Sequence, residues 1–169
     1  MDLDAEINRA AELRDLKLYR ESIEVCSRLL EAHPECSRAY YTRAGSLRLQ
    51  QRISEAIEDV RRAIALDPLE PAFRYFCGHW LLEVGDLHEA IQNMDECIRL
   101  EQMHEDIYYL SSAYFIRAIA RFQLGQFDLA LKDCEQLNDS DTTYVKKLYS
   151  VEGLKKEAAE GRKRSARRN

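Results

Sequence analysis

Apolar residues recur every three or four positions along most of the chain, and this spacing predicts amphipathic helices. Two such stripes consist of Ile57, Val60, Ala63 and Ile64, and of Ile91, Met94 and Ile98. A half-buried strand would instead alternate apolar and polar residues at every second position. Short breakers separate the helical stretches, and two of them contain Gly85 and Gly125, which suit the left-handed conformation that ends a helix.

The helical sequence pattern repeats at a nearly fixed interval. The segment ESIEVCSRLLEAHP ends at Pro34, and EAIEDVRRAIALDP ends at Pro68, 34 residues later; the segments 85–101 and 125–138 follow the same plan. Equivalent small residues are Ser22, Ala56, Ala90 and Ala130, each preceded by a second small residue 12 positions earlier, at Ala10, Ala44, Gly78 and Ala118. This offset predicts two antiparallel helices that cross closely, because a larger side chain there would push the backbones apart.

A 34-residue helix–turn–helix unit with small residues at positions 8 and 20 and proline at position 32 resembles the tetratricopeptide repeat. The resemblance implies an all-α fold, a superhelix of about four repeats followed by a C-terminal capping helix that covers the last hydrophobic face. The repeats are expected at 3–36, 37–70, 71–104 and, after six extra residues, 111–144.

The end of the chain is expected to differ from the repeats. A capping helix is predicted over 141–160, because four apolar residues share one helical face there: Tyr144, Leu148, Val151 and Leu154. We expect a single domain over 1–160 and a basic, disordered tail over 161–169. The tail either stays solvated or contacts an acidic partner or nucleic acid.

Composition and charge narrow the function. The chain has 169 residues, of which 46% are apolar and 33% charged, enough to bury a core, while 6 Gly and 3 Pro are too few for a sandwich or barrel. The net charge is −5, but residues 146–169 carry nine Lys/Arg against three Glu, so the remainder carries −11 and is expected to repel nucleic acid. An acidic N-terminus without an apolar stretch, and the lack of a membrane-length apolar run, predict a cytoplasmic protein without a membrane partner.

Few residues stand at spacings typical of disulfides, metal sites or catalytic sites. The five cysteines at 26, 36, 77, 97 and 134 form no CxxC pair, so we expect reduced, mostly buried thiols. His79 and Glu83 stand four residues apart, which suits either a polar pair on a helix face or two metal ligands, but no third ligand has supporting spacing. With no phosphate loop and no nucleophile motif, the sequence predicts a protein that is not an enzyme and holds no cofactor or metal.

The resemblance also implies a binding surface. In tetratricopeptide-repeat proteins the first helix of each repeat lines a concave groove through positions 2, 5, 6, 9, 12 and 13, which here are rich in aromatic and apolar residues. The residues expected to bind a partner are Arg38, Tyr41, Arg48, Tyr75, Phe76, His79, Leu82, Phe115, Ile119 and Phe122. Because an exposed apolar patch commonly marks a partner site, we expect a protein-interaction module that buries a segment of another protein against these rings, with the arginines selecting acidic neighbours.

Several partner classes are distinguished by sequence. Relatives that bind the C-terminal tails of heat-shock chaperones place lysine, asparagine and arginine at fixed groove positions, where this chain has Ile7, Ala11, Thr42, Ala72 and Phe76. We therefore predict no binding of such tails. Two other interpretations stay open. One is a bacterial secretion chaperone or immunity protein that neutralises a cognate toxin, and the other is a self-associating scaffold such as a homodimer. In place of a foreign partner, the chain's own C-terminal helix or a second copy of the chain would then fill the groove.

Overall fold

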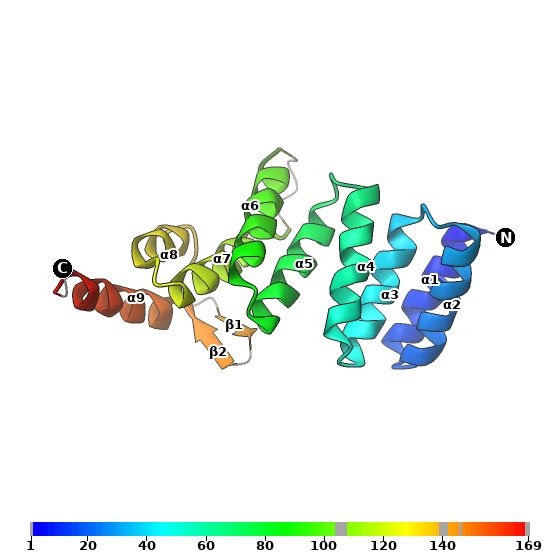
Figure 1. Ribbon diagram of the computed structural model, residues 1–169, viewed down its shortest axis with the longest axis horizontal. Coiled ribbons are helices and arrows are strands. Elements are labelled where there is room, and N and C mark those ends of the chain that lie inside the picture. Colours follow the sequence, from blue (N-terminus) through cyan, green and yellow to red (C-terminus); the bar gives the residue numbers. More distant parts are fainter. Residues whose placement is uncertain (1, 104–107, 139–141, 146, 168–169) are drawn as a thin grey trace. The chain divides into compact units, whose positions relative to one another are not determined.

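The computed structural model describes residues 2–103, 108–138, 142–145 and 147–167 (Figure 1). The helices are α1 (Leu3–Asp15), α2 (Tyr19–Ala32), α3 (Ser37–Leu49), α4 (Ile53–Leu66), α5 (Pro71–Val84), α6 (Leu87–Met103), α7 (Leu110–Gln123), α8 (Phe127–Cys134) and α9 (Val151–Ala166). Each predicted repeat contains one helix pair, which confirms the all-α repeat architecture. Two compact units, Met1–Phe73 and Arg74–Asn169, divide the chain within α5, and each is described by itself.

The turn inside every helix pair uses the same backbone conformation. Gly85 and Gly125 have φ of 91° and 74°, as predicted, and the equivalent residues of the first two repeats, Lys17 and Gln51, both have φ of 64°. Left-handed φ costs a residue with a Cβ more than it costs glycine. The turn geometry is therefore imposed by the helix pairing even where the sequence lacks glycine.

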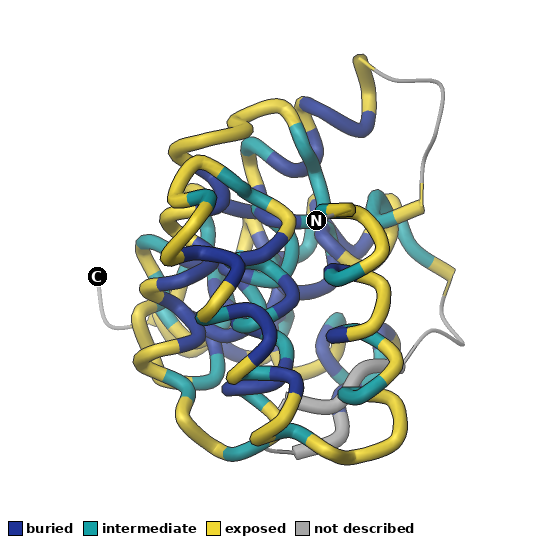
Figure 2. Tube along the Cα trace, turned by 90° about the vertical axis from the view of Figure 1, so that its right-hand side faces the viewer, coloured by how far each residue is buried: buried dark blue, intermediate teal, exposed yellow. Residues whose placement is uncertain are grey.

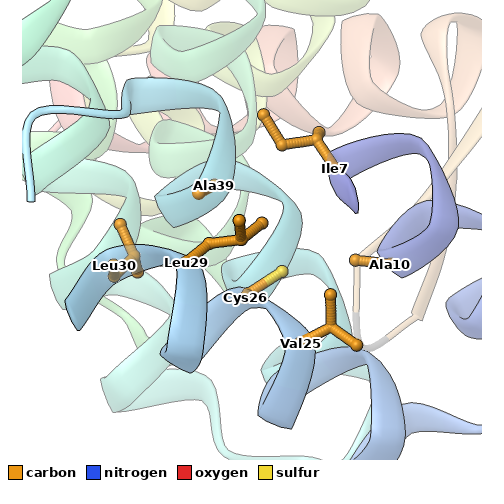
Figure 3. Packing of buried hydrophobic residues seen from close by; sticks show 7 residues of the cluster. All are labelled: Ile7, Ala10, Val25, Cys26, Leu29, Leu30 and Ala39. Atoms are coloured by element: carbon orange, nitrogen blue, oxygen red, sulfur yellow. The ribbon is translucent and has the colours of Figure 1, made fainter. Parts of the chain in front are cut away.

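In the first unit, the predicted close crossing of paired helices is visible in the hydrogen bonds. The Ser22 hydroxyl donates to the Ala10 carbonyl of α1 at 2.7 Å and lies 2.7 Å from the Ser46 hydroxyl of α3. Ala10 and Ser22 are both fully buried, and Ala10 belongs to a core of apolar residues from α1, α2 and α3 (Figure 3). That cluster consists of Ile7, Ala10, Val25, Cys26, Leu29, Leu30 and Ala39.

In the second unit, Gly78 of α5 faces α6 at the equivalent crossing. A methyl group on Gly78 would lie 3.0 Å from the Ala90 carbonyl oxygen and 3.1 Å from Asn93 Cβ, and would overlap the Met94 methyl. The corresponding alanines of the last repeat, Ala118 and Ala130, are fully buried. Along the chain, buried positions alternate with exposed ones within each helix, as an amphipathic stripe requires (Figure 2).

The predicted bounds of the C-terminal helix are wrong. Two short antiparallel strands, β1 (Thr142–Val145) and β2 (Lys147–Ser150), precede the helix, with Thr142 opposite Ser150. Runs of Thr, Tyr and Val favour strands over helices. The helix α9 then begins after Ser150, whose hydroxyl accepts a hydrogen bond from the Gly153 amide at 3.0 Å.

The prediction of a disordered tail over 161–169 is also wrong for most of that segment, because α9 continues to Ala166. Its apolar face packs on α8, and Gly161 lies so close to the Phe127 ring that a methyl group there would overlap it. Arg162 forms an ion pair with Asp128 of α8 at 3.0 Å. The helix therefore covers the last repeat as expected of a cap, and residues 168–169 lie outside the described part of the chain.

Candidate functional site

Six aromatic side chains of the second unit gather where α5 approaches the start of α7. We call them the aromatic cluster: Tyr75, Phe76, His79, Trp80, Tyr108 and Tyr109. The Tyr75 and Tyr109 rings stack with centroids 4.8 Å apart, and Phe76 lies edge-on to Tyr75 at 5.1 Å. Tyr108 stands edge-on to Tyr109 at 4.8 Å and is 79% exposed. The cluster thus presents an accessible ring on a foundation of stacked, half-buried ones.

A buried carboxylate holds the aromatic cluster in place. Glu101, near the end of α6, is 2% exposed and accepts a hydrogen bond from the Tyr109 backbone amide at 2.9 Å. This bond fixes the residue that immediately precedes α7. Burial raises the pKa of the Tyr75 hydroxyl, against a hydrogen bond to Ser112 that acts in the opposite direction. Tyr75 is therefore a neutral phenol at physiological pH.

Three of the predicted binding residues lie in the interior instead of on a surface. Leu82 is 3% exposed, Phe115 3% and Ile119 fully buried. Each contributes to packing within the second unit, so none offers its side chain to a partner in this conformation. The prediction that these three residues face a groove, which was based on their repeat positions, is therefore wrong.

The remaining predicted residues of the second unit are half-buried. The Phe122 ring packs on Phe127 of α8 with centroids 5.8 Å apart. His79 Nε2 lies 3.7 Å from Glu83 Oε1, and the His79 ring lies 6.0 Å from Tyr75. Across the residues that the structure describes, no group of three or more His, Cys, Asp or Glu side chains is arranged to hold a metal ion.

The first unit contains Arg38, Tyr41 and Arg48 from α3. The Tyr41 ring packs against Phe73 at 5.0 Å, and Arg38 forms an ion pair with Asp4 of α1. Arg14 of α1 lies over Gly45, where a methyl group would approach its Nη1 atom to 3.3 Å. The α3 face toward α1 therefore combines aromatic and cationic side chains, and Gly45 leaves room for Arg14.

A repeated ion-pair system, not expected from the sequence, joins paired helices in repeats two and four. Arg43 donates from Nε and Nη2 to the two Asp59 oxygens at 2.7 and 2.8 Å, and Arg117 donates likewise to Asp133 at 3.1 and 2.6 Å. Each arginine also lies over a tyrosine ring one turn earlier, at 5.6 Å for Tyr40 and 5.1 Å for Tyr114. The signal was present as Tyr-x-x-Arg followed by Asp 16 residues later in repeats two and four.

Electrostatics support these pairs. The hydrogen bond to Asp59 raises the pKa of Arg43. For Arg117, burial opposes the charged form, but hydrogen bonds to Asp133 and Asp95 outweigh it and raise the pKa. Both guanidiniums are therefore firmly cationic, as a buried carboxylate partner requires.

The cysteines take no part in the candidate site. Cys26, Cys77, Cys97 and Cys134 are fully buried, and Cys36 is half-buried. Burial raises the pKa of Cys26 to about 12, and burial with the nearby Glu101 charge does the same for Cys97. These thiols are protonated and unreactive at neutral pH.

Comparison with known proteins supports the repeat assignment. Residues 15–97 match the family described as anaphase-promoting complex, cyclosome, subunit 3. Protein FlbA of Caulobacter vibrioides is 37% identical over 92 residues, which cover 54% of this chain but only 14% of FlbA. The matched segment is thus a small part of that relative.

Solved structures share the fold at low sequence identity. A crystal structure of MamA superposes with a TM-score of 0.70 at 19% identity, covering 98% of this chain and 81% of MamA. PilW, a type IV pilus biogenesis factor, superposes with a TM-score of 0.68 at 18% identity over 79% of this chain and 60% of PilW. YrrB, a TPR protein with an unusual peptide-binding site, superposes with a TM-score of 0.68 at 18% identity over 77% of this chain and 64% of YrrB.

None of the helices in the described residues has both the length and the hydropathy needed to cross a bilayer. The 34-residue period, the helix pair in each repeat and the shared fold lead to the same assignment. We conclude that the chain has the tetratricopeptide-repeat fold.

Proposed function

We propose that the chain is a non-enzymatic protein-interaction module whose aromatic cluster binds a segment of a partner protein. The observation that carries the proposal is Tyr108, a ring that is 79% exposed yet rests on the Tyr109–Tyr75 stack. Exposed tyrosine on a rigid base supplies large contact area at little entropic cost, which is typical of interaction hot spots.

Two further observations support this proposal. Met103, at the end of α6, is 63% exposed, so a second large apolar side chain lies close in sequence to Tyr108. The structural relative YrrB is described as having a peptide-binding site, which makes a peptide segment the natural kind of partner to test first. Arg38, Tyr41 and Arg48 of the first unit stay predicted contacts for the same role.

The test is capture of a partner from native cell extract, its identification, and measurement of its affinity for purified variants. Tyr108→Ser removes the exposed ring without touching the core, and we expect it to weaken binding at least tenfold, the loss that removal of a hot-spot aromatic produces. Leu66→Ser is the matched control, because Leu66 is an exposed apolar residue of α4 outside the cluster. Equal affinity of both variants and the parent chain would contradict the proposal.

Phe76→Asp gives a stronger perturbation of the aromatic cluster. We expect it to abolish partner binding while the helical circular-dichroism signal persists. Light scattering over a range of concentrations distinguishes a homodimeric scaffold from a monomer that binds a foreign partner. A concentration-dependent mass that Tyr108→Ser removes would assign the aromatic cluster to self-association instead.

A further inference from the structure

A polar cavity of about 240 Å³ opens on the first unit, beside the Arg43–Asp59 pair. It is lined by Ile23 and Ser27 of α2, Arg43 and Leu47 of α3, and Arg52, Glu55, Glu58 and Asp59 at or near α4. The volume corresponds to several water molecules at roughly 30 Å³ each, which is room for a small polar group. The aromatic cluster is not part of this cavity.

The second unit repeats the Arg–Asp pair of this cavity, but a second arginine contacts the aspartate there, and Lys132 stands at the repeat position of Glu58. Arg117 and Asp133 occupy the repeat positions of Arg43 and Asp59, and Asp95 occupies that of Ser27. The repeat position of Leu47 is Arg121, whose Nη1 donates to Asp133 Oδ2 at 2.8 Å and whose Nη2 lies 3.7 Å from Asp95 Oδ1. A guanidinium of the chain itself therefore sits on the carboxylate that corresponds to Asp59.

The acceptor geometry shows what the cavity lacks. Asp133 Oδ2 accepts from both Arg117 Nε and Arg121 Nη1. Asp59 Oδ2 accepts from Arg43 Nε at 2.7 Å, and Asp59 is one of the residues that line the cavity. Because a carboxylate oxygen can accept two hydrogen bonds, Asp59 offers the cavity the acceptor that Asp133 gives to Arg121.

The charges around the cavity indicate what kind of group would complete it. Asp95 and Asp133 are balanced by Arg117 and Arg121 in the second unit. The cavity of the first unit is lined by three carboxylates, those of Glu55, Glu58 and Asp59, against the two guanidiniums of Arg43 and Arg52. One additional cation would balance this set, and a planar guanidinium matches carboxylate acceptors better than an ammonium does.

We propose that this cavity is a binding site for a guanidinium group, the place of Arg121 in the second unit being taken here by an arginine side chain from outside the chain. Asp59 and Glu58 would accept its hydrogen bonds, and Leu47 would contact its aliphatic stem. The group reaches the site either on a polypeptide segment or as a free arginine derivative. This proposal is independent of the aromatic cluster, so either can fail without the other.

The experiment is a titration of the full chain with N-acetyl-arginine amide, followed through backbone amide NMR shifts. We expect saturable shifts at Ser27, Glu55 and Glu58 and none around Asp133, where Arg121 already fills the space. N-acetyl-citrulline amide, neutral and nearly the same shape, is the control ligand. Absence of saturable shifts, or equal shifts with citrulline, would overturn the proposal.

Variants separate this site from general attraction to an acidic surface. Glu58→Gln should weaken binding about tenfold, the size of one lost charge-assisted hydrogen bond, whereas Glu24→Gln, an exposed α2 residue outside the cavity, should leave it unchanged. Equal weakening by both variants would overturn the proposal, because the ligand would then only sense net charge.

Two exchanges between the units test the equivalence directly. Leu47→Arg should fill the cavity and abolish the shifts. Because Leu47 is 4% exposed and its replacement can disturb folding, Arg121→Leu provides the reciprocal test. It should open the equivalent space and create new saturable shifts near Asp133; failure of that site to appear in a folded variant would count against the proposal.

An arginine-containing peptide that binds more tightly than the amide identifies a polypeptide as the source, and equal affinity identifies a free arginine derivative.

Discussion

The guanidinium of Arg43 and the carboxylate of Asp59 form a two-point ion pair across α3 and α4, and Arg117 and Asp133 repeat it across α7 and α8. In both cases the partners lie 16 residues apart, and Asp59 and Asp133 are 7% and 2% exposed. Both carboxylates are almost fully buried, so removing either one leaves a half-buried guanidinium without its charged partner. The paired helices of repeats two and four are therefore joined by a charged contact as well as by apolar packing.

Asp59→Ala should destabilise the fold by about 3 kcal/mol, because it leaves the half-buried Arg43 without its carboxylate. Urea unfolding followed by circular dichroism measures the loss. Glu55→Ala, which breaks the exposed Arg52–Glu55 pair, is the control and should change stability little. The double variant Arg43→Met/Asp59→Leu should recover most of the lost stability. If the double variant is as unstable as Asp59→Ala, Asp59 stabilises the fold by something other than its ion pair with Arg43.

Gly78→Ala should destabilise the fold by about 1–3 kcal/mol, since the added methyl group has no room beside Met94 and the Ala90 carbonyl. In repeat two, Ala44 and the smaller Val60 stand at the repeat positions of Gly78 and Met94. Adding Met94→Val to Gly78→Ala should therefore restore part of the stability. Gly45→Ala, where only the flexible end of Arg14 is near, serves as control and should be neutral or stabilising.

Gln51→Gly should stabilise the fold by about 0.5 kcal/mol, because residue 51 has the left-handed φ that glycine adopts without strain. Part of the gain is offset by the greater freedom of glycine in the unfolded chain. Thermal unfolding of Gln51→Gly and of Gln50→Gly compares the two neighbouring positions. Gln50 has a φ of −85°, so glycine there should only destabilise; the same effect at both positions would refute the strain at residue 51.

Native labelling with a thiol reagent should modify Cys36 well before the other four cysteines, because only Cys36 is partly accessible. Mass spectrometry after a short exposure identifies the labelled site. Rapid modification of Cys26 or Cys97 in the folded chain would contradict the burial and the raised pKa of these thiols. Labelling under denaturing conditions, where all five react, is the control.

The same thiols predict a dependence of stability on pH. The pKa of Cys26 and Cys97 is about 12 in the folded chain, above the ordinary value of 9.0 that they regain on unfolding. Between these values the unfolded chain has lost protons that the folded chain retains, so the free energy of unfolding falls as the pH rises. Urea midpoints at about pH 8 and about pH 10 measure the fall, and Cys26→Ala should reduce it relative to the parent chain.

The repeat architecture was predictable because its determinants are local and periodic. Ala10 and Ser22, or Gly78 and Ala90, are 12 residues apart in sequence and touch in space, so their small size leaves a regular trace. The same regularity predicted the left-handed turns at Gly85 and Gly125. In repeat four, Arg121 replaces the apolar residue that repeat two has at Leu47. The contact that explains this arginine, its hydrogen bond to Asp133, becomes visible only when α7 and α8 are paired in the structure.

The exposure of the predicted groove residues was harder to predict, because it depends on neighbours that repeat position does not specify. Leu82, Phe115 and Ile119 occupy positions that line a groove in an ideal array, yet they are buried here. The aromatic foundation under Tyr108 arises from Tyr109 meeting Tyr75, a contact between segments more than 30 residues apart. The strands before α9 also escaped prediction, because the apolar spacing of that stretch fits a helix as well.

Glu101 and the Tyr75–Tyr109 stack secure the two sides of the junction at which the fourth repeat is displaced from the 34-residue period. Repeat four keeps its Arg117–Asp133 contact in spite of that displacement. Helix pairing in repeat four therefore tolerates the six extra residues, so further changes in the number of residues between α6 and α7 should leave the Arg117–Asp133 contact intact.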